Sequence, residues 1–222
     1  MIRRLTTIVL AAGLGFSLLF LGFSASSFRL PGNQQDYEPL QPIRYSHRLH
    51  AGELEIPCLY CHFGAERSRH AGIPPTNVCM NCHQFVSAPL GAIKAEGEAA
   101  SQENRPPRPI ISPEIQKLYD AAGFSPPNPA QPTTAPPASE PRPIAWTRVH
   151  NLPDFVRFDH RPHVNAGVAC QSCHGPVETM ERVKQASDLS MGWCVNCHRD
   201  ANQSGIDGKP VQASLDCVAC HY

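Results

Sequence analysis

All ten cysteines of this 222-residue chain occur in one repeated motif, Cys-x-x-Cys-His. The five copies read CLYCH, CMNCH, CQSCH, CVNCH and CVACH. Residues i, i+3 and i+4 of a helix lie on one face, so two thiols can bond one porphyrin while the histidine points to its iron. This is the attachment pattern of c-type haem, and we predict five covalently bound haem c groups. The predicted attachment residues are Cys58, Cys61, Cys79, Cys82, Cys170, Cys173, Cys194, Cys197, Cys217 and Cys220.

Zinc ribbons and disulfides are the alternative interpretations of paired cysteines. A zinc ribbon uses two Cys-x-x-Cys pairs for each metal and needs no histidine after every pair. A disulfide within Cys-x-x-Cys would close only a very small loop. Five histidines after five pairs therefore favour haem over both alternatives.

The eleven histidines are numerous enough to provide two ligands to every iron. The predicted proximal ligands, each directly following a cysteine pair, are His62, His83, His174, His198 and His221. The predicted distal ligands, with one to spare, are His47, His50, His70, His150, His160 and His163. Ligation by two histidines would give low-spin, low-potential haems without an open iron position, so we predict an electron-transfer protein and not an enzyme.

An aromatic-x-His-x-x-His sequence precedes the first and third haem motifs, at 45–50 and 158–163. The two histidines of each copy share a helical face but lie one turn apart, which is too far to bind one iron from the same side. Each copy is therefore expected to serve two different haems and to hold those haems close together.

The sequence assigns some of the distal histidines to particular haems. His70 lies between the first two motifs and is the local candidate for the second haem, while His47 and His160 are assigned to the first and third. His150 is the expected spare histidine. Met80 and Met191 are rival ligands that would raise the reduction potential, but their positions within or just before motifs favour packing against porphyrin.

The elements that position these residues cannot rely on an ordinary core. The chain has 23 prolines against 15 glycines, and only 17% of its residues are charged. Its formal net charge of zero argues against a nucleic-acid-binding surface. We expect a mainly irregular chain with short α-helices packed around five covalent haems, preceded by one N-terminal transmembrane helix.

Four segments are predicted along the chain. Residues 1–28 form an anchor or signal segment, 37–92 a block with two haem motifs, 93–143 a proline-rich linker or strap, and 144–222 a block with three haem motifs. Within the linker, residues 113–123 predict a short helix with proline in its first turn and glycine after its end.

The N-terminal segment 5–23 contains 19 residues without a charge. A helix of that length reaches roughly 28 Å, close to the thickness of a hydrocarbon core. Arg3 and Arg4 precede it, which predicts a single-pass helix with its N-terminus in the cytoplasm and the haem-binding part on the outer face of the membrane. The alternative is a cleaved secretory signal ending at 24–26.

Three longer stretches, at 46–86, 148–164 and 188–199, resemble the pentahaem cytochrome c subunit of bacterial alternative complex III, a membrane-bound quinol:electron-acceptor oxidoreductase. The aromatic-x-His-x-x-His openings are also similar to those of class III multihaem cytochromes, although Tyr45 stands where phenylalanine is usual. The resemblance implies an iron–sulfur protein subunit, polytopic quinol-binding membrane subunits and a monohaem cytochrome c as partners.

The same resemblance implies that electrons from quinol oxidation pass through these haems to a soluble carrier or a terminal oxidase. One alternative is a stand-alone, membrane-anchored multihaem quinol dehydrogenase. Another is a multihaem reductase of small nitrogen or sulfur compounds, which would need one five-coordinate iron. All five motifs here end in histidine, and this favours electron transfer.

Overall fold

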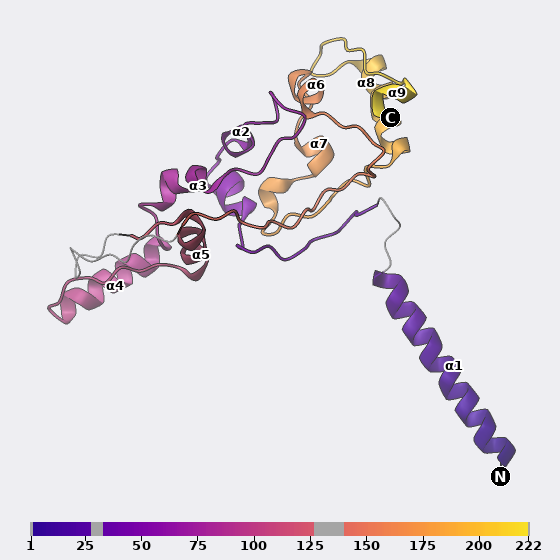
Figure 1. The fold of residues 1–222 in the computed structure, drawn as a ribbon, viewed down its shortest axis with the longest axis horizontal. Coiled ribbons are helices and arrows are strands. Elements are labelled where there is room, and N and C mark those ends of the chain that lie inside the picture. Colours follow the sequence, from indigo (N-terminus) through magenta and orange to yellow (C-terminus); the bar gives the residue numbers. More distant parts are fainter. Residues whose placement is uncertain (1, 28–32, 127–139, 222) are drawn as a thin grey trace.

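The computed structural model describes residues 2–27, 33–126 and 140–221, and these consist of short helices joined by irregular chain (Figure 1). In the described residues no β-strand is present, and β-type pairing is limited to isolated bridges between Val156 and His221 and between Ile206 and Lys209. The predicted mainly irregular, helical fold is therefore confirmed.

In chain order the elements are α1 (Ile2–Ser27), the π-helix η1 (Arg48–Glu53), α2 (Cys58–Cys61), α3 (Thr76–His83), α4 (Leu90–Gln102), α5 (Pro113–Ala122), α6 (His160–Asn165), α7 (Gln171–His174), the 3₁₀-helix η2 (Val177–Thr179), α8 (Met191–Ser204) and α9 (Cys217–Cys220).

Each of the five haem motifs lies on a helical turn, namely in or beside α2, α3, α7, α8 and α9. Local capping explains where two of these helices begin. The Ser190 hydroxyl accepts a hydrogen bond from Trp193 N–H at the start of α8, and the Asp216 carboxylate accepts one from Val218 N–H at the start of α9. The motifs thus have the helical geometry that haem attachment requires.

The short helix predicted at 113–123 is confirmed as α5. Ser112 caps its first turn, Pro113 occupies its first position, and Gly123 ends it in the left-handed conformation with φ 64°. The buried side chain of Tyr119 donates a hydrogen bond to the carbonyl of His83 over 2.6 Å, and this contact docks α5 onto α3. The proline-rich segment is therefore partly helical, and its residues 127–139 lie outside the described part.

Helix α4 lies mostly within the segment predicted as a proline-rich linker, although Gly91 and Gly97 lower its helix propensity. Residues that follow α4 in the chain stabilise this helix. The Arg105 guanidinium bonds the Glu96 carboxylate over 2.5 Å, and the same carboxylate accepts a hydrogen bond from Arg108 N–H. This ion pair holds the pKa of Glu96 down at about 2.

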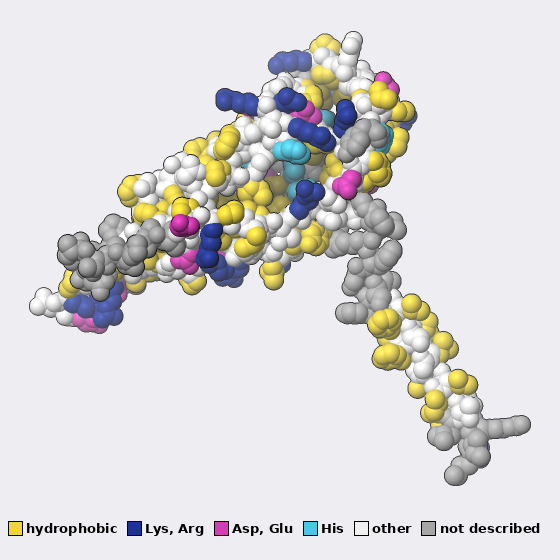
Figure 2. Space-filling model, in the orientation of Figure 1, with side chains coloured by type: hydrophobic (Ala, Val, Ile, Leu, Met, Phe, Trp, Pro, Cys, Tyr) yellow, Lys and Arg dark blue, Asp and Glu magenta, His cyan; other side chains and the backbone are white. Residues whose placement is uncertain are grey.

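The protein side chains alone form almost no hydrophobic core. Within the described ranges, the buried apolar side chains are Ala65, Ala88, Ala100, Leu118, Tyr119, Ala121 and Ala201. Most are alanines, which bury little area each. Figure 2 shows histidine side chains within a hollow of the molecule, bordered by Lys and Arg side chains. The interior is thus lined by potential ligands where a core would ordinarily be.

Helix α1 is the longest element and covers the apolar N-terminal segment. Apolar side chains described along it, such as those of Leu10, Phe16 and Leu19, are exposed. Among the residues that the structure describes, no helix meets the combined length and hydropathy expected of a membrane span.

Candidate haem-binding sites

The first and third proximal histidines each face a distal histidine across a gap with parallel ring planes. The ring centres of His47 and His62 are 6.5 Å apart, with 5° between their planes. Those of His160 and His174 are 6.3 Å apart, again with 5° between the planes. These are the two pairs that were assigned to the first and third haems.

The second and fourth proximal histidines face distal histidines with tilted planes. His50 and His83 have ring centres 6.0 Å apart at 57°, and His163 and His198 have centres 6.0 Å apart at 37°. The structure therefore places His50, rather than His70, opposite the second proximal histidine. Each aromatic-x-His-x-x-His segment reaches two different haem motifs.

These separations fit one iron between two imidazoles. Metal–nitrogen bonds of about 2 Å, plus about 1.1 Å from each nitrogen to its ring centre, place two opposite ring centres roughly 6.2 Å apart. The four observed distances, from 6.0 to 6.5 Å, agree with that value. A bound porphyrin would supply the other four nitrogens, so the two histidines of a pair would complete the coordination of one iron. Within the described part no larger group of His, Cys, Asp or Glu is arranged to hold a metal by itself.

Hydrogen bonds hold most of these rings with Nε2 free for iron. Six of them direct Nδ1 at a backbone carbonyl, namely His50 to Ser46 (2.9 Å), His62 to Gly72 (2.7 Å), His83 to Val86 (2.9 Å), His160 to Arg69 (2.9 Å), His163 to Asp159 (2.8 Å) and His198 to Ser214 (2.6 Å). A carbonyl only accepts, so each Nδ1 carries the proton and Nε2 keeps its lone pair. This orientation is typical of metal-ligating histidines.

Two rings of the four pairs differ in their Nδ1 environment. Nδ1 of His174 lies 3.1 Å from Nε2 of His150, and Nδ1 of His47 is buried with no hydrogen-bond partner in the described chain. Burial, reinforced by neighbouring histidines, lowers the pKa of His47 and of His174 to about 4. Both rings are therefore neutral at physiological pH, and the neutral imidazole is the form that binds a metal.

In each aromatic-x-His-x-x-His segment, the aromatic ring contacts both histidines, and the contacts are similar in the two segments. The Tyr45 ring meets His47 edge-on at 4.8 Å and stacks on His50 at 4.4 Å with 25° between planes. Phe158 meets His160 edge-on at 4.8 Å and lies 4.8 Å from His163 at 30°. Burial raises the pKa of the Tyr45 hydroxyl, which therefore stays neutral.

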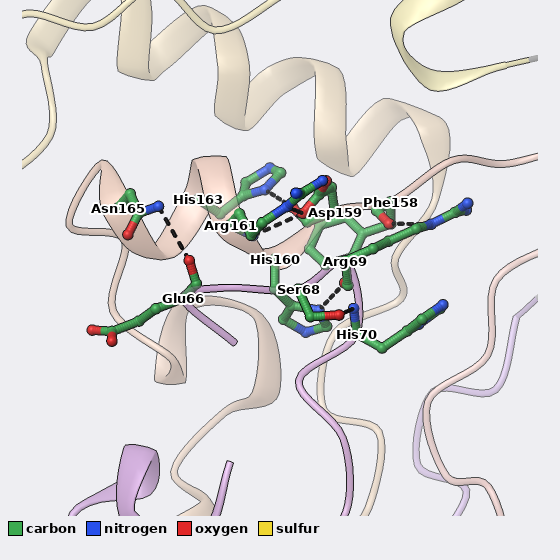
Figure 3. Close-up of polar contacts among 10 residues, drawn as sticks. All are labelled: Glu66, Ser68, Arg69, His70, Phe158, Asp159, His160, Arg161, His163 and Asn165. Atoms are coloured by element: carbon green, nitrogen blue, oxygen red, sulfur yellow. Dashed lines mark hydrogen bonds and ion pairs between the residues drawn. The ribbon is translucent and has the colours of Figure 1, made fainter. Parts of the chain in front are cut away.

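Figure 3 shows how α6 is joined to the first haem block. Asp159 caps α6 by accepting a hydrogen bond from Arg161 N–H, and its carboxylate also binds the Arg161 guanidinium. The carbonyl of Arg69 is the partner of His160 Nδ1, and the Arg69 side chain donates to the carbonyl of Phe158 over 2.9 Å. The 66–70 segment thus positions a distal histidine of the second block.

The fifth motif is anchored to the chain that precedes α6. Arg157 N–H donates to the Cys220 carbonyl over 2.7 Å, and the His221 ring stacks on Phe155 at 5.8 Å with 29° between planes. A cavity of about 500 Å³ beside this motif is lined by Arg69, Arg157, Phe158, Asp159 and Ala219. Arginines at that position suit the propionates of a haem.

The remaining predicted ligands do not face a proximal histidine in this way. His70 is exposed and follows Arg69, and its backbone N–H donates to the Ser68 hydroxyl (Figure 3). Met191 begins α8 and is 66% exposed, while His198 on the same helix faces His163. Sequence reasoning missed the carbonyl partners of the histidines, because every residue carries the same backbone acceptor.

The haem motifs lie next to one another. Besides burial, the charge of Cys61 raises the pKa of Cys79, which links the first and second motifs. Burial and the neighbouring Cys58 raise the pKa of Cys170, which links the first and third motifs. Burial and the neighbouring Cys197 and Cys194 of the fourth motif raise the pKa of Cys173 in the third motif. Burial and the neighbouring Cys220 of the fifth motif likewise raise the pKa of Cys194. Cysteines of the second and first motifs, the first and third, the third and fourth, and the fourth and fifth therefore lie near one another.

Comparisons with known proteins agree with the haem chemistry. Residues 156–222 match the family model described as cytochrome c7 and related cytochrome c. Over 201 residues the chain is 23% identical to the multihaem cytochrome c subunit of a menaquinone reductase from Nitratidesulfovibrio vulgaris, covering 82% of this chain and 76% of that relative. The cytochrome c family implies covalent haem c, and residues 156–222 are similar to cytochrome c7 and related multihaem cytochromes.

Proposed function

We propose that this chain is the pentahaem electron-transfer subunit of a membrane-bound quinol:acceptor oxidoreductase of the alternative complex III type. The observation that supports this most is the set of four facing histidine pairs at 6.0 to 6.5 Å. Irons held between two histidines have no position for a substrate, so they conduct electrons.

The haem ligation follows the pairing of the rings. His62 and His47 hold the first iron, His83 and His50 the second, His174 and His160 the third, and His198 and His163 the fourth. His221 is the proximal ligand of the fifth. The ten cysteines attach the porphyrins, and when bound the haems supply reversible one-electron chemistry.

The neighbouring motifs make these haems one continuous path. His47 and His50 lie on one turn and hold the first two haems together, and His160 and His163 do the same for the third and fourth. The contact of Cys58 with Cys170 joins the two halves. Electrons would therefore enter at one end, the second or the fifth haem, and leave at the other.

The proposed partners and location rest on one similar protein and on the sequence itself. The similar menaquinone reductase protein is one subunit of a quinone-reacting enzyme. The resemblance of the sequence to the alternative complex III subunit supports an iron–sulfur subunit, polytopic quinol-binding subunits and a monohaem cytochrome c as the partners of this chain. The uncharged segment 5–23 anchors it to the bacterial inner membrane, with the haems on the periplasmic face.

A second candidate function is quinone reduction, which the name of the similar protein favours. Rapid mixing of the purified native complex distinguishes quinol oxidation from quinone reduction. In the proposed function, added quinol reduces the haems, and a soluble carrier or terminal oxidase then reoxidises them. In the second, pre-reduced haems are oxidised by added menaquinone, while quinol leaves oxidised haems unchanged.

The same preparation tests the electron-transfer role itself. We expect the isolated chain to contain five haems by pyridine haemochrome and to show no quinol oxidation or nitrite reduction by itself. Turnover of quinol by the isolated chain would point to a stand-alone dehydrogenase. Nitrite or sulfite reduction at a high-spin haem would point to a reductase. Either result refutes the proposal.

A further inference from the structure

The ring of His150 contacts the outer edge of the third proximal histidine. Its Nε2 lies 3.1 Å from Nδ1 of His174, with ring centres 4.4 Å apart and planes at 80°. Of two imidazole nitrogens this close, one can donate a hydrogen bond and the other accept it. When Nε2 of His174 binds iron, as proposed, the ring proton is on Nδ1 and is donated to Nε2 of His150.

This acceptor differs chemically from those of the other paired rings. Three other proximal histidines donate to the backbone carbonyls of Gly72, Val86 and Ser214. An imidazole nitrogen is a more basic acceptor than an amide oxygen, and it draws the proton further from the donating ring. His174 therefore gains more anionic character than the proximal ligands that bond carbonyls.

We propose that His150 is a positioning residue for the third haem, which fixes the tautomer of His174 and lowers the reduction potential of that haem. This inference rests on the proposed ligation of the third iron by His174 and His160. An electron-rich ligand stabilises ferric over ferrous iron, so the third haem, at the centre of the predicted path, is held at a lower potential.

The surrounding chain holds His150 in place. Gln185 is fully buried, and its side chain accepts a hydrogen bond from Asn151 N–H over 3.3 Å and donates to the Ser187 carbonyl over 3.0 Å. A buried amide bonded at both ends fixes the backbone beside His150. The contact is thus built into the fold by residues far apart in the sequence.

Close packing also fixes the other side of the contact. Gly175 follows His174 with φ 70°, and a Cβ added there would lie 2.6 Å from the Cβ of Ala186. Only glycine allows the 174–175 turn to approach residues 185–187 this closely. Both ends of the hydrogen bond therefore pack against one segment.

The first haem provides an internal comparison. His47 and His62 face each other with the same 5° between planes as His160 and His174, but His62 donates to the carbonyl of Gly72. The two sites thus share ligand orientation and differ in the acceptor. We expect the third haem to titrate at a lower potential than the first.

The test uses the full-length holoprotein with His150→Leu, His150→Gln and a remote control, Gln116→Leu on α5. Potentiometric titration, followed by absorbance and by electron paramagnetic resonance, resolves the individual haems. In His150→Leu one haem shifts to a higher midpoint potential, while all five haems and their low-spin signals are retained. In His150→Gln the amide oxygen restores an acceptor, so the shift is smaller, and in Gln116→Leu it is absent.

Two results would overturn the inference. One is an unchanged set of midpoint potentials in His150→Leu with five haems present. The other is loss of a haem, or a new high-spin haem, in that variant, because it would identify His150 as an iron ligand. The wild-type spectrum tests the underlying ligation separately, since fewer than four low-spin haems would refute the proposed pairing itself.

Discussion

Removing one distal histidine is expected to open a single iron among the five. In His160→Leu the leucine side chain cannot coordinate a metal, and the ring that faced His174 across 6.3 Å is lost. His150 cannot replace it, because His150 contacts the Nδ1 edge of His174, away from the iron. The third haem therefore becomes five-coordinate while its two thioether bonds remain.

The size of the effect follows from the stoichiometry. One haem of the five predicted from the sequence changes, so about one-fifth of the ferric iron converts from low to high spin relative to the wild type. The reduced variant also gains one carbon monoxide site per chain. Spin quantification by electron paramagnetic resonance and carbon monoxide titration measure the two changes.

A control on the same helix separates ligand loss from general disturbance of α6. Asn165 lies on α6 and donates only a long hydrogen bond, 3.4 Å, to the Glu66 carbonyl. Asn165→Leu should leave both measurements at wild-type values. If His160→Leu retains the wild-type spin distribution and binds no additional carbon monoxide, the pairing of His160 with His174 is incorrect.

Truncation after Asp216 removes the fifth motif and should lower the haem content from five to four by pyridine haemochrome; a content of five would exclude haem attachment there. Electron paramagnetic resonance should separate the four paired haems into two classes, because parallel ligand planes split the iron d orbitals more than tilted planes do; four identical signals would contradict the ring geometry. Tyr119→Phe removes one buried hydrogen bond to His83 and should lower the free energy of unfolding by about 1 kcal/mol in thermal or chemical denaturation. Glu96→Gln should lower the melting temperature at neutral pH but have little effect near pH 2: the pKa of Glu96 falls from 4.5 to about 2 on folding, so its stabilisation is present above pH 4.5 and disappears as the pH falls towards 2. Equal destabilisation at both pH values would refute the assigned ion pair.

Short-range features of this protein could be predicted from the sequence. The haem motifs and the helix at 113–123 depend on residues within one or two turns, where spacing and capping determine the geometry. The division of each His-x-x-His between two haems also follows from spacing along a helix. The structure has helical turns at the motifs and at 113–122, and each His-x-x-His segment faces the histidines of two different motifs.

Long-range features could not be predicted in the same way. Whether His50 or His70 faces His83 depends on the position of η1 relative to α3. The local sequence does not determine that position. The contact between His150 and His174 depends on the buried Gln185, which is a single polar residue without a recognisable motif. Helix α4 depends on a later arginine, Arg105, for its ion pair.

The duplicated aromatic-x-His-x-x-His segment explains how so little protein core can position so many cofactors. In both copies one aromatic ring meets the first histidine edge-on and lies nearly parallel to the second. The ring therefore separates the two imidazoles and sets their directions towards different irons. Because the aromatic ring makes these contacts in both copies, tyrosine serves at 45 as phenylalanine does at 158. Each segment orients two predicted ligands with one half-buried ring, and bound haems would supply the apolar surface that the scarce buried side chains do not.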